Sequence, residues 1–272
     1  MRQFSISPVE MCASLWRNRG LILASAKREV LGRYRGSALG LLWSFFNPLL
    51  MLAVYTFVFS EIFKARWNAA SESKTEFALV LFAGLIVFNL FAECINRAPS
   101  LVLSNVNYVK KVVFPLEILP VVALLSSLFH AGISLAVWLL AYSVLVGLPH
   151  ATTLYLPLLV IPYLLFIMGL GWALASLGVY LRDVTQFIGV LTTMLMFLSP
   201  IFYPATNLPE TYRSWLYLNP LTAVIEQTRA VLYWGQVPDF ALLAIYWAAT
   251  SLIAWLGFAW FQKTRKGFAD VL

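Results

Sequence analysis

The sequence predicts an all-α integral membrane protein. The predicted elements are six transmembrane helices, an amino-terminal amphipathic interface helix, and external re-entrant helices between spans five and six. Hydrophobic residues make up 61% of the 272 residues and charged residues only 11%, whereas soluble domains carry about 25% charged residues. Several apolar runs also reach the roughly 20 residues that a helix needs to cross a bilayer. This composition argues against a soluble globular enzyme.

The segment before the first span predicts a helix that lies in the headgroup layer. Between residues 9 and 34, apolar side chains are interleaved with cations, which is typical of interfacial helices. Ser7, Pro8 and Glu10 resemble a helix start, because a hydroxyl cap, a first-turn proline and an acid follow one another. Gly36 ends the basic part and permits a sharp turn into the first span.

Six apolar stretches predict the spans. They cover residues 39–63, 77–94, 116–146, 154–180, 187–202 and 240–261. The fifth stretch is short for a bilayer-spanning helix. Between the second and third, Pro99 is expected to open a short amphipathic helix that runs to about Asn107 and offers a docking surface for a partner. Pro115 and Pro120 limit helix continuation before the third span.

The region between the last two spans predicts re-entrant structure. Pro200, Pro204 and Pro209 interrupt the chain after the fifth span. Asn219 and Pro220 then resemble a cap and a first-turn proline. The helix that follows is too short and too polar to cross a bilayer, so we expect it to lie on the external face or to re-enter the protein.

The distribution of Lys and Arg predicts the orientation. With six spans both termini share one side, and that side holds fourteen of the 19 Lys and Arg residues. Cytoplasmic loops carry such an excess, so both termini are predicted to be cytoplasmic. The net charge of +7 is then explained by these loops and by anionic lipid headgroups, and no nucleic-acid partner is expected.

Catalytic and metal-binding motifs are missing from the sequence. There is no GxxxxGK[ST] phosphate loop, no HExxH and no GxSxG, so we expect no catalytic residue and no metal site on this chain. His130 is read as a helix-interface residue and His150 as a loop residue. Glu117 lies at a span end, where we expect it to pair with Lys110 or Lys111.

Five stretches resemble one transporter family. They are RYRGSALGLLWSFFNPLLMLAVYTFVF, NVNYVKKVVFPLEILP, GVYLRDVTQFIGVLTTMLMFLSPIFYP, LNPLTAVIEQTRAVLYWG and KTRKGFADVL. In this order they resemble the membrane subunit of polysaccharide-export ABC transporters, the permeases for O-antigen, capsule and teichoic acid chains. The resemblance covers nearly the whole chain. It implies one permease domain over residues 1–272, with a cytoplasmic amphipathic segment (1–38), a six-span bundle (39–262) and a cytoplasmic tail (263–272).

The resemblance also implies partners and a substrate. Two copies of the chain would form a channel in the bacterial inner membrane, above two copies of a cytoplasmic ATP-binding subunit that carry the ATP and Mg. This chain itself would hold no cofactor. The substrate would be a polysaccharide on a polyprenyl diphosphate lipid, with O-antigen as the first choice.

Three sets of residues are candidates for these roles. The set expected to bind the diphosphate headgroup is Lys27, Arg28, Arg33 and Arg35, because guanidinium groups bind phosphate oxygens in a bidentate way. The aromatic side chains expected to line the channel are Trp43, Phe46, Tyr55, Phe59, Phe88, Phe91 and Trp172. The set expected to contact the ATPase is Asn105, Asn107, Lys110, Lys111, Arg182 and Asp183. Membrane anchoring, helix packing and a simple ion pair remain open as alternatives for the three sets.

Other functions stay open at this point. An exporter of capsule, teichoic acid or a drug would share the architecture. A glycosyl- or phosphotransferase acting on a polyprenyl lipid would need clustered carboxylates to hold a metal, and the cytoplasmic loops offer only Asp183. An ion- or proton-coupled carrier is disfavoured because the middle of each span carries no acid.

Overall fold

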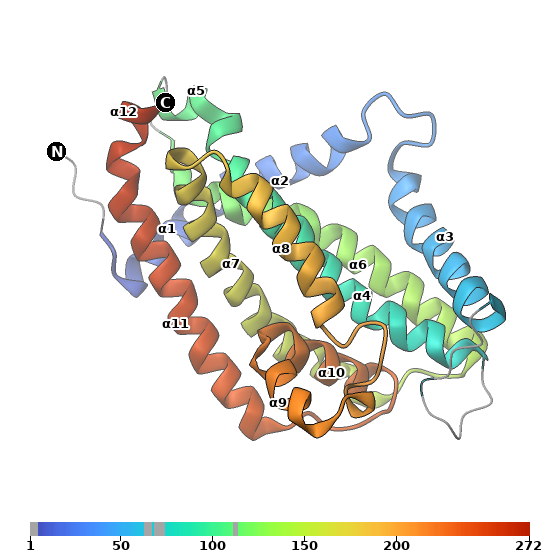
Figure 1. Ribbon diagram of the computed structural model, residues 1–272. Coiled ribbons are helices and arrows are strands. Elements are labelled where there is room, and N and C mark those ends of the chain that lie inside the picture. Colours follow the sequence, from blue (N-terminus) through green and yellow to red (C-terminus); the bar gives the residue numbers. More distant parts are fainter. Residues whose placement is uncertain (1–4, 63–66, 68–73, 111–113) are drawn as a thin grey trace.

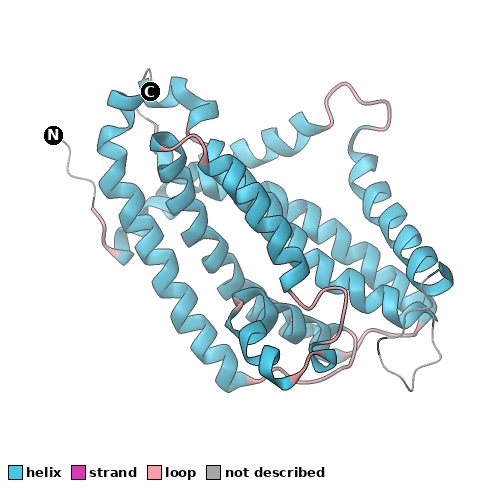
Figure 2. Ribbon diagram, in the orientation of Figure 1, coloured by secondary structure: helices cyan, strands magenta, loops and turns pink. Residues whose placement is uncertain are grey.

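The computed structural model describes residues 5–62, 67, 74–110 and 114–272, and in this part of the chain every regular element is a helix (Figures 1 and 2). The helices are α1 (Pro8–Arg17), α2 (Arg19–Arg33), α3 (Trp43–Phe57), α4 (Lys74–Arg97), α5 (Val106–Lys110), α6 (Leu119–Leu145), α7 (Leu156–Tyr180), α8 (Val184–Leu198), α9 (Glu210–Leu218), α10 (Pro220–Leu232), α11 (Phe240–Thr264) and α12 (Phe268–Val271). One end of the bundle, the terminal face, carries α1, α2, α5 and α12. The opposite end, the far face, carries α9 and α10 (Figure 1).

Five helical segments are long and apolar enough to cross a membrane. They are Gly40–Phe57, Thr75–Ser100, Leu116–Leu145, Ala151–Tyr180 and Phe240–Val271. The predicted fifth span corresponds to α8, which has 15 residues and is therefore about 22 Å long at 1.5 Å per residue, short of a bilayer core of about 30 Å. The sequence thus predicted an all-α membrane protein correctly, with one apolar helix shorter than a full span.

Helix α4 is the centre of the bundle. It packs against α3, α6, α7, α8 and α10, and 78% of its apolar window is buried, compared with 11% for the window of α3. The polar atoms of large side chains around it donate hydrogen bonds to backbone carbonyls. Trp138 Nε1 donates to Leu79 O (2.8 Å) and the Tyr163 hydroxyl to Val87 O (2.7 Å). Such bonds allow aromatic rings with a polar atom to be buried without an unpaired donor.

Helices α7 and α11 approach each other at two glycines. A Cβ atom on Gly257 would lie 2.0 Å from Gly169 O, and one on Gly169 would lie 2.5 Å from Ile253 O. The backbones therefore touch where neither helix has a side chain, a common way for membrane helices to pack. Gly171, also in α7, has only an ordinary contact with Pro120 (3.6 Å).

This close approach gives a prediction about stability. Gly257→Ala is expected to lower the thermal unfolding midpoint, because the new methyl group forces α7 and α11 apart and overpacking costs about 1–3 kcal/mol. Gly189→Ala in α8 is the matched control, since a Cβ there meets nothing within 4 Å and alanine favours a helix by about 1 kcal/mol over glycine. Differential scanning fluorimetry of both variants in detergent measures the effect. Equal midpoints would contradict the packing at Gly257.

The amino-terminal helix signals are confirmed. Ser7 Oγ accepts from the Glu10 amide (3.0 Å), and Gly36 has a φ of 85°, as expected of a turn. The predicted single helix is two helices, because the Asn18 side chain donates to Ser14 O (2.8 Å) and caps α1 before α2 begins. On the far face, Asn219 caps α10 by accepting from the Leu221 amide (3.0 Å), also as predicted.

Candidate functional site

A polar groove lies between the end of α2 and helices α3, α4 and α6. Its volume is about 260 Å³, and its lining residues are Arg33, Tyr34, Ser44, Asn47, Pro48, Met51, Tyr55, Phe82, Asn89, His130 and Ser134. Arg33 lies near the terminal face. Phe82 is 15 residues before the end of α4 at Arg97, which places it about 22 Å deeper along the helix. The groove therefore runs from the membrane surface into the bundle.

Arg33 is part of an ionic network at the mouth of the groove. It forms an ion pair with Glu93 of α4. Glu93 lies 3.9 Å from Arg97 one turn further along α4, and Arg97 pairs with Glu29 of α2 at 2.5 Å. Two acids and two arginines thus tie α2 to α4. The side chains of Arg33 and Glu93 are 38% and 26% exposed, so water reaches this network and its ion pairs contribute little stability.

The four predicted headgroup residues do not share one position. Arg33 alone lines the groove. Arg28 Nη2 donates to the Tyr108 hydroxyl of α5 (3.2 Å), and this hydrogen bond raises the pKa of Arg28. Lys27 and Arg35 are exposed, and the described structure gives neither of them an ion pair. The cluster is therefore spread along α2 and the turn that follows it.

Hydrogen-bonding groups line the groove beside Arg33. The Tyr34 hydroxyl lies 3.4 Å from His130 Nδ1, and the two rings meet edge to face. The interface role predicted for His130 is thus confirmed. Burial raises the pKa of the Tyr34 hydroxyl, which therefore stays protonated at neutral pH. With Asn47 and Asn89, these groups can donate to and accept from hydroxyl or phosphate oxygens.

The seven predicted channel aromatics separate into two groups. Trp43 and Phe46 are exposed on α3, Tyr55 lines the groove, and Phe59 stacks on Phe77 with ring centroids 5.1 Å apart. The other three are buried in the core of this protomer. Their exposed fractions are 4% for Phe88, 3% for Phe91 and 2% for Trp172.

The predicted partner-binding residues lie on the terminal face, except Lys111, which is outside the described residues. Asn107, Lys110, Arg182 and Asp183 are exposed. Lys110 Nζ donates to the carbonyl of Leu272, so the short helix α5 is held against the carboxyl terminus. Asn105 instead donates to Leu101 O (2.8 Å) within its own turn. An exposed surface of α5 and the α7–α8 turn remains for a partner.

The expected pairing of Glu117 with Lys110 is wrong, and Lys111 lies outside the described residues. Glu117 pairs with Arg265 at the end of α11 (Nη1–Oε2 2.6 Å) and accepts from Ser14 Oγ of α1 (2.8 Å). Its side chain points into the bundle, whereas Lys110 lies at the surface beside Leu272. The carboxylate therefore joins three elements that are far apart in the sequence.

Arg229 in α10 has a structural role that no local feature of the sequence indicates. This side chain is fully buried (0% exposed). Its guanidinium donates to the carbonyls of Val80 (2.9 Å), Pro200 and Ile201 (2.8 Å). It also pairs with Glu226 at 3.1 Å and lies 4.4 Å from the centre of the Trp67 ring. Burial lowers the pKa of Arg229 to about 10, so it remains positively charged at neutral pH.

Similarities to known proteins extend over almost the whole chain. Residues 20–233 match the family described as ABC-2 type transporter. The O-antigen export system permease protein RfbA of Myxococcus xanthus is 28% identical over 264 residues, covering 96% of this chain and 99% of that protein. RfbA of Klebsiella pneumoniae is 24% identical over 254 residues, with coverage of 93% and 95%. The polysialic acid transport protein KpsM of Escherichia coli is 26% identical over 244 residues, with coverage of 88% and 91%.

Proposed function

This chain belongs to the ABC-2 type transporter family, and from that premise we propose that it forms the membrane channel of an ATP-driven exporter of polyprenyl-diphosphate-linked polysaccharide, with O-antigen as the first choice. The observation that carries the proposal is the end-to-end similarity to an O-antigen export permease, which covers 96% of this chain. The location that follows is the bacterial inner membrane.

The proposed assembly contains two copies of this chain and two ATP-binding subunits. The sequence has no phosphate loop, so ATP and Mg are assigned to the partner subunit. Helix α3 exposes apolar side chains on most of its surface (Leu50, Met51, Val54, Phe57), which supports a second copy packing near α3.

The polar groove is proposed as the entry site for the lipid diphosphate. Arg33 and Arg35, with Lys27 and Arg28 along α2, supply cations at the membrane surface. From there, aromatic side chains of α3 and of the π-helical segment Val58–Ile62 that continues it offer ring faces for weak, repeated contacts with sugars. These side chains are Trp43, Phe46, Tyr55 and Phe59. Phe88, Phe91 and Trp172 are left out of this proposed wall because they are buried inside the protomer.

The ATPase contact is proposed at α5 and the α7–α8 turn. The test uses a chain with the substitutions Cys12→Ser and Asn107→Cys, co-expressed with its ATPase. A short bifunctional thiol crosslinker is expected to join this chain to the ATPase subunit, because residue 107 is exposed on the terminal face. The matched control is Ser214→Cys, an exposed position on α9 of the far face. Capture at residue 214 and none at residue 107 would contradict the assignment.

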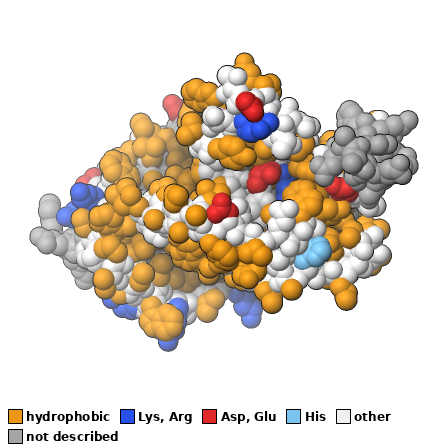
Figure 3. All heavy atoms as spheres, turned by 90° about the horizontal axis from the view of Figure 1, so that it is seen from below, with side chains coloured by type: hydrophobic (Ala, Val, Ile, Leu, Met, Phe, Trp, Pro, Cys, Tyr) orange, Lys and Arg blue, Asp and Glu red, His pale blue; other side chains and the backbone are white. Residues whose placement is uncertain are grey.

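The proposed orientation places the terminal face in the cytoplasm. Figure 3 views the far face, where hydrophobic side chains predominate. The excess of Lys and Arg predicted for the side of the termini, fourteen of 19, supports this orientation. Alkaline phosphatase fused after Leu272 is expected to be inactive, and the same enzyme fused after Gly235 is expected to be active. The reverse pattern would overturn the orientation.

Deletion of the gene tests the function itself. The mutant is expected to lose surface O-antigen and to accumulate the lipid-linked glycan on the cytoplasmic side, with recovery from a plasmid copy. The second candidate is capsule export, favoured by the similarity to KpsM. Loss of capsule with intact lipopolysaccharide would select this second candidate, and loss of neither glycan would overturn both.

A further inference from the structure

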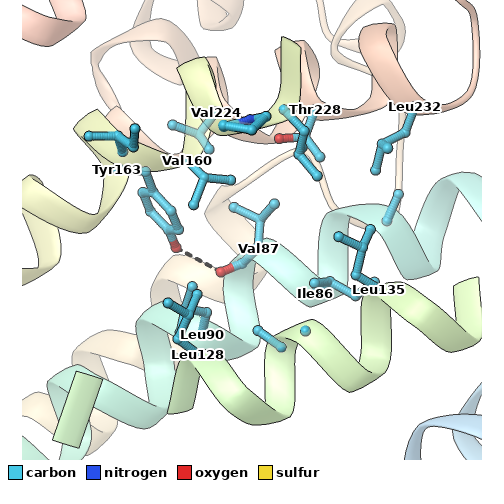
Figure 4. A pocket seen from close by; sticks show the side chains of 16 residues that line it. Ile86, Val87, Leu90, Leu128, Leu135, Val160, Tyr163, Val224, Thr228 and Leu232 are labelled. Carbon is cyan, nitrogen blue, oxygen red and sulfur yellow. Dashed lines mark hydrogen bonds between the residues drawn. The ribbon is translucent and has the colours of Figure 1, made fainter. Parts of the chain in front are cut away.

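A second cavity, distinct from the polar groove, lies between α4, α6, α7 and α10. Its volume is about 320 Å³, within the range of about 300–1,000 Å³ that holds small-molecule ligands. Figure 4 shows Val87 and Leu90 of α4, Leu128 and Leu135 of α6, and Val160 and Tyr163 of α7 around it, with α10 contributing Val224, Thr228 and Leu232. No residue assigned to the proposed transport path lines this cavity.

The lining of this cavity is suited to hydrocarbon. Nearly all of its side chains are aliphatic. The Tyr163 hydroxyl is already bonded to Val87 O (2.7 Å; Figure 4). The only other side-chain hydroxyl on its wall, that of Thr228, is buried and has no partner in the described structure. A single hydroxyl cannot hold water, which needs two to four polar partners, and apolar cavities of this kind stay dry and take apolar ligands.

The cavity opens toward the bilayer. Ala83, Val87 and Leu232 are buried at its floor, whereas Gly132 of α6 and Ile161 of α7 are exposed at its edge. Both α6 and α7 lie within membrane-spanning segments, so the medium at this opening is lipid hydrocarbon. The residues of α7 and α10 that line it are near the far face, which places the opening in the leaflet on that side.

We propose that an acyl chain of a membrane phospholipid occupies this cavity from the far-face leaflet. The chain would be an integral part of the packing of α10. Val224 and Thr228 of α10 contact the cavity, while Arg229 beside them binds the backbone of α4 and of the turn after α8. Helix α10 is therefore held by Arg229 on one side and by the acyl chain on the other. This inference does not depend on which glycan the protein exports.

The test uses the full chain in lipid nanodiscs that contain a phospholipid with a diazirine on one acyl chain. After irradiation and digestion, mass spectrometry is expected to find adducts on α10 and on residues 83–90 of α4. Gly132→Leu should reduce these adducts at least fivefold. A Cβ at Gly132 meets no atom within 4 Å, so the leucine can fill the cavity without a clash. Ala136→Leu, one helical turn further on α6 at an exposed position outside the cavity, should label like the wild type.

Each remaining outcome is decisive. Equal labelling of α10 in wild type and Gly132→Leu, or adducts confined to exposed faces such as that of α8, would overturn the proposal. Labelling by a diazirine polyprenyl phosphate and not by the phospholipid would overturn the choice of occupant. If Gly132→Leu does not elute as a monodisperse protein, Val160→Phe blocks the cavity from α7 and is judged by the same fivefold criterion.

Discussion

Replacing Arg229 by alanine is expected to destabilise the protein more than any other single truncation of a charged side chain. The substitution removes the donors to three backbone carbonyls, those of Val80, Pro200 and Ile201. Pro200 and Ile201 follow the end of α8, outside any helix, so their carbonyls have no helical amide to replace the guanidinium. Leaving a buried acceptor unsatisfied costs about 1–3 kcal/mol. The ion pair with Glu226 adds little, because the Glu226 side chain is 34% exposed and can be solvated when the arginine is absent.

The expected loss of about 3–5 kcal/mol, which comes from the carbonyls left without a donor, is a large part of a typical unfolding free energy of about 5–15 kcal/mol. Scanning fluorimetry in nanodiscs should show a clear drop in the unfolding midpoint of Arg229→Ala. Arg213→Ala is the matched control. Arg213 also donates to backbone carbonyls, of Thr206 and Leu208, but it lies nearer the surface of the far face, so its loss should cost less.

A second variant separates the position of Arg229 from its charge. Gly84→Ala leaves the arginine in place, but the new Cβ would lie 2.5 Å from Arg229 Nη2 and 3.0 Å from its Cζ. The guanidinium must then move away from its acceptors, so this variant should also unfold at a lower temperature. If both Gly84→Ala and Arg229→Ala unfold at the wild-type midpoint, the network does not stabilise the far face.

Hydropathy and capping predicted the fold well because both are local properties of the chain. Ser7 and Asn219 cap helices whose first turns follow them directly, and each apolar run is a continuous stretch. The shortness of α8 was also visible, since Pro200 lies just beyond its end. These features need no knowledge of which helices are neighbours.

The ion pairs could not be predicted, because their partners are distant in the sequence. Arg33 and Glu93 are 60 residues apart, and Glu117 and Arg265 are 148 apart. Only the tertiary arrangement selects Arg265 over the nearer Lys110 as the partner of Glu117. The burial of three of the predicted channel aromatics could not be predicted for a related reason. When a helix is apolar on all sides, its sequence does not reveal which side faces the core, so Phe88 and Trp172 could not be separated from Trp43.

Replacing both Arg33 and Arg35 by alanine is expected to reduce export of the lipid-linked glycan at least tenfold and to leave membrane insertion intact. The ion pair of Arg33 with Glu93 is partly exposed, and such a pair is worth about 0–1 kcal/mol. A diphosphate group carries more negative charge than one carboxylate and can accept two parallel bonds from a guanidinium. It can therefore displace Glu93 at little cost, whereas an alanine at residue 33 offers no charge at the mouth of the groove.

Glu93→Gln distinguishes headgroup binding from a purely structural ion pair. If the Arg33–Glu93 pair only holds α2 against α4, Glu93→Gln and Arg33→Ala break the same contact and should impair export alike. If Arg33 binds the diphosphate, Glu93→Gln removes a competing anion, so binding of a fluorescent polyprenyl diphosphate to the purified protein should strengthen, while Arg33→Ala should weaken it.

The matched control for charge removal is the double variant Arg17→Ala, Arg19→Ala, which takes two exposed cations from the same interfacial segment outside the groove. Wild-type export by the Arg33, Arg35 double variant, or an equal loss in this control, would show that the basic segment only anchors the protein to the membrane surface.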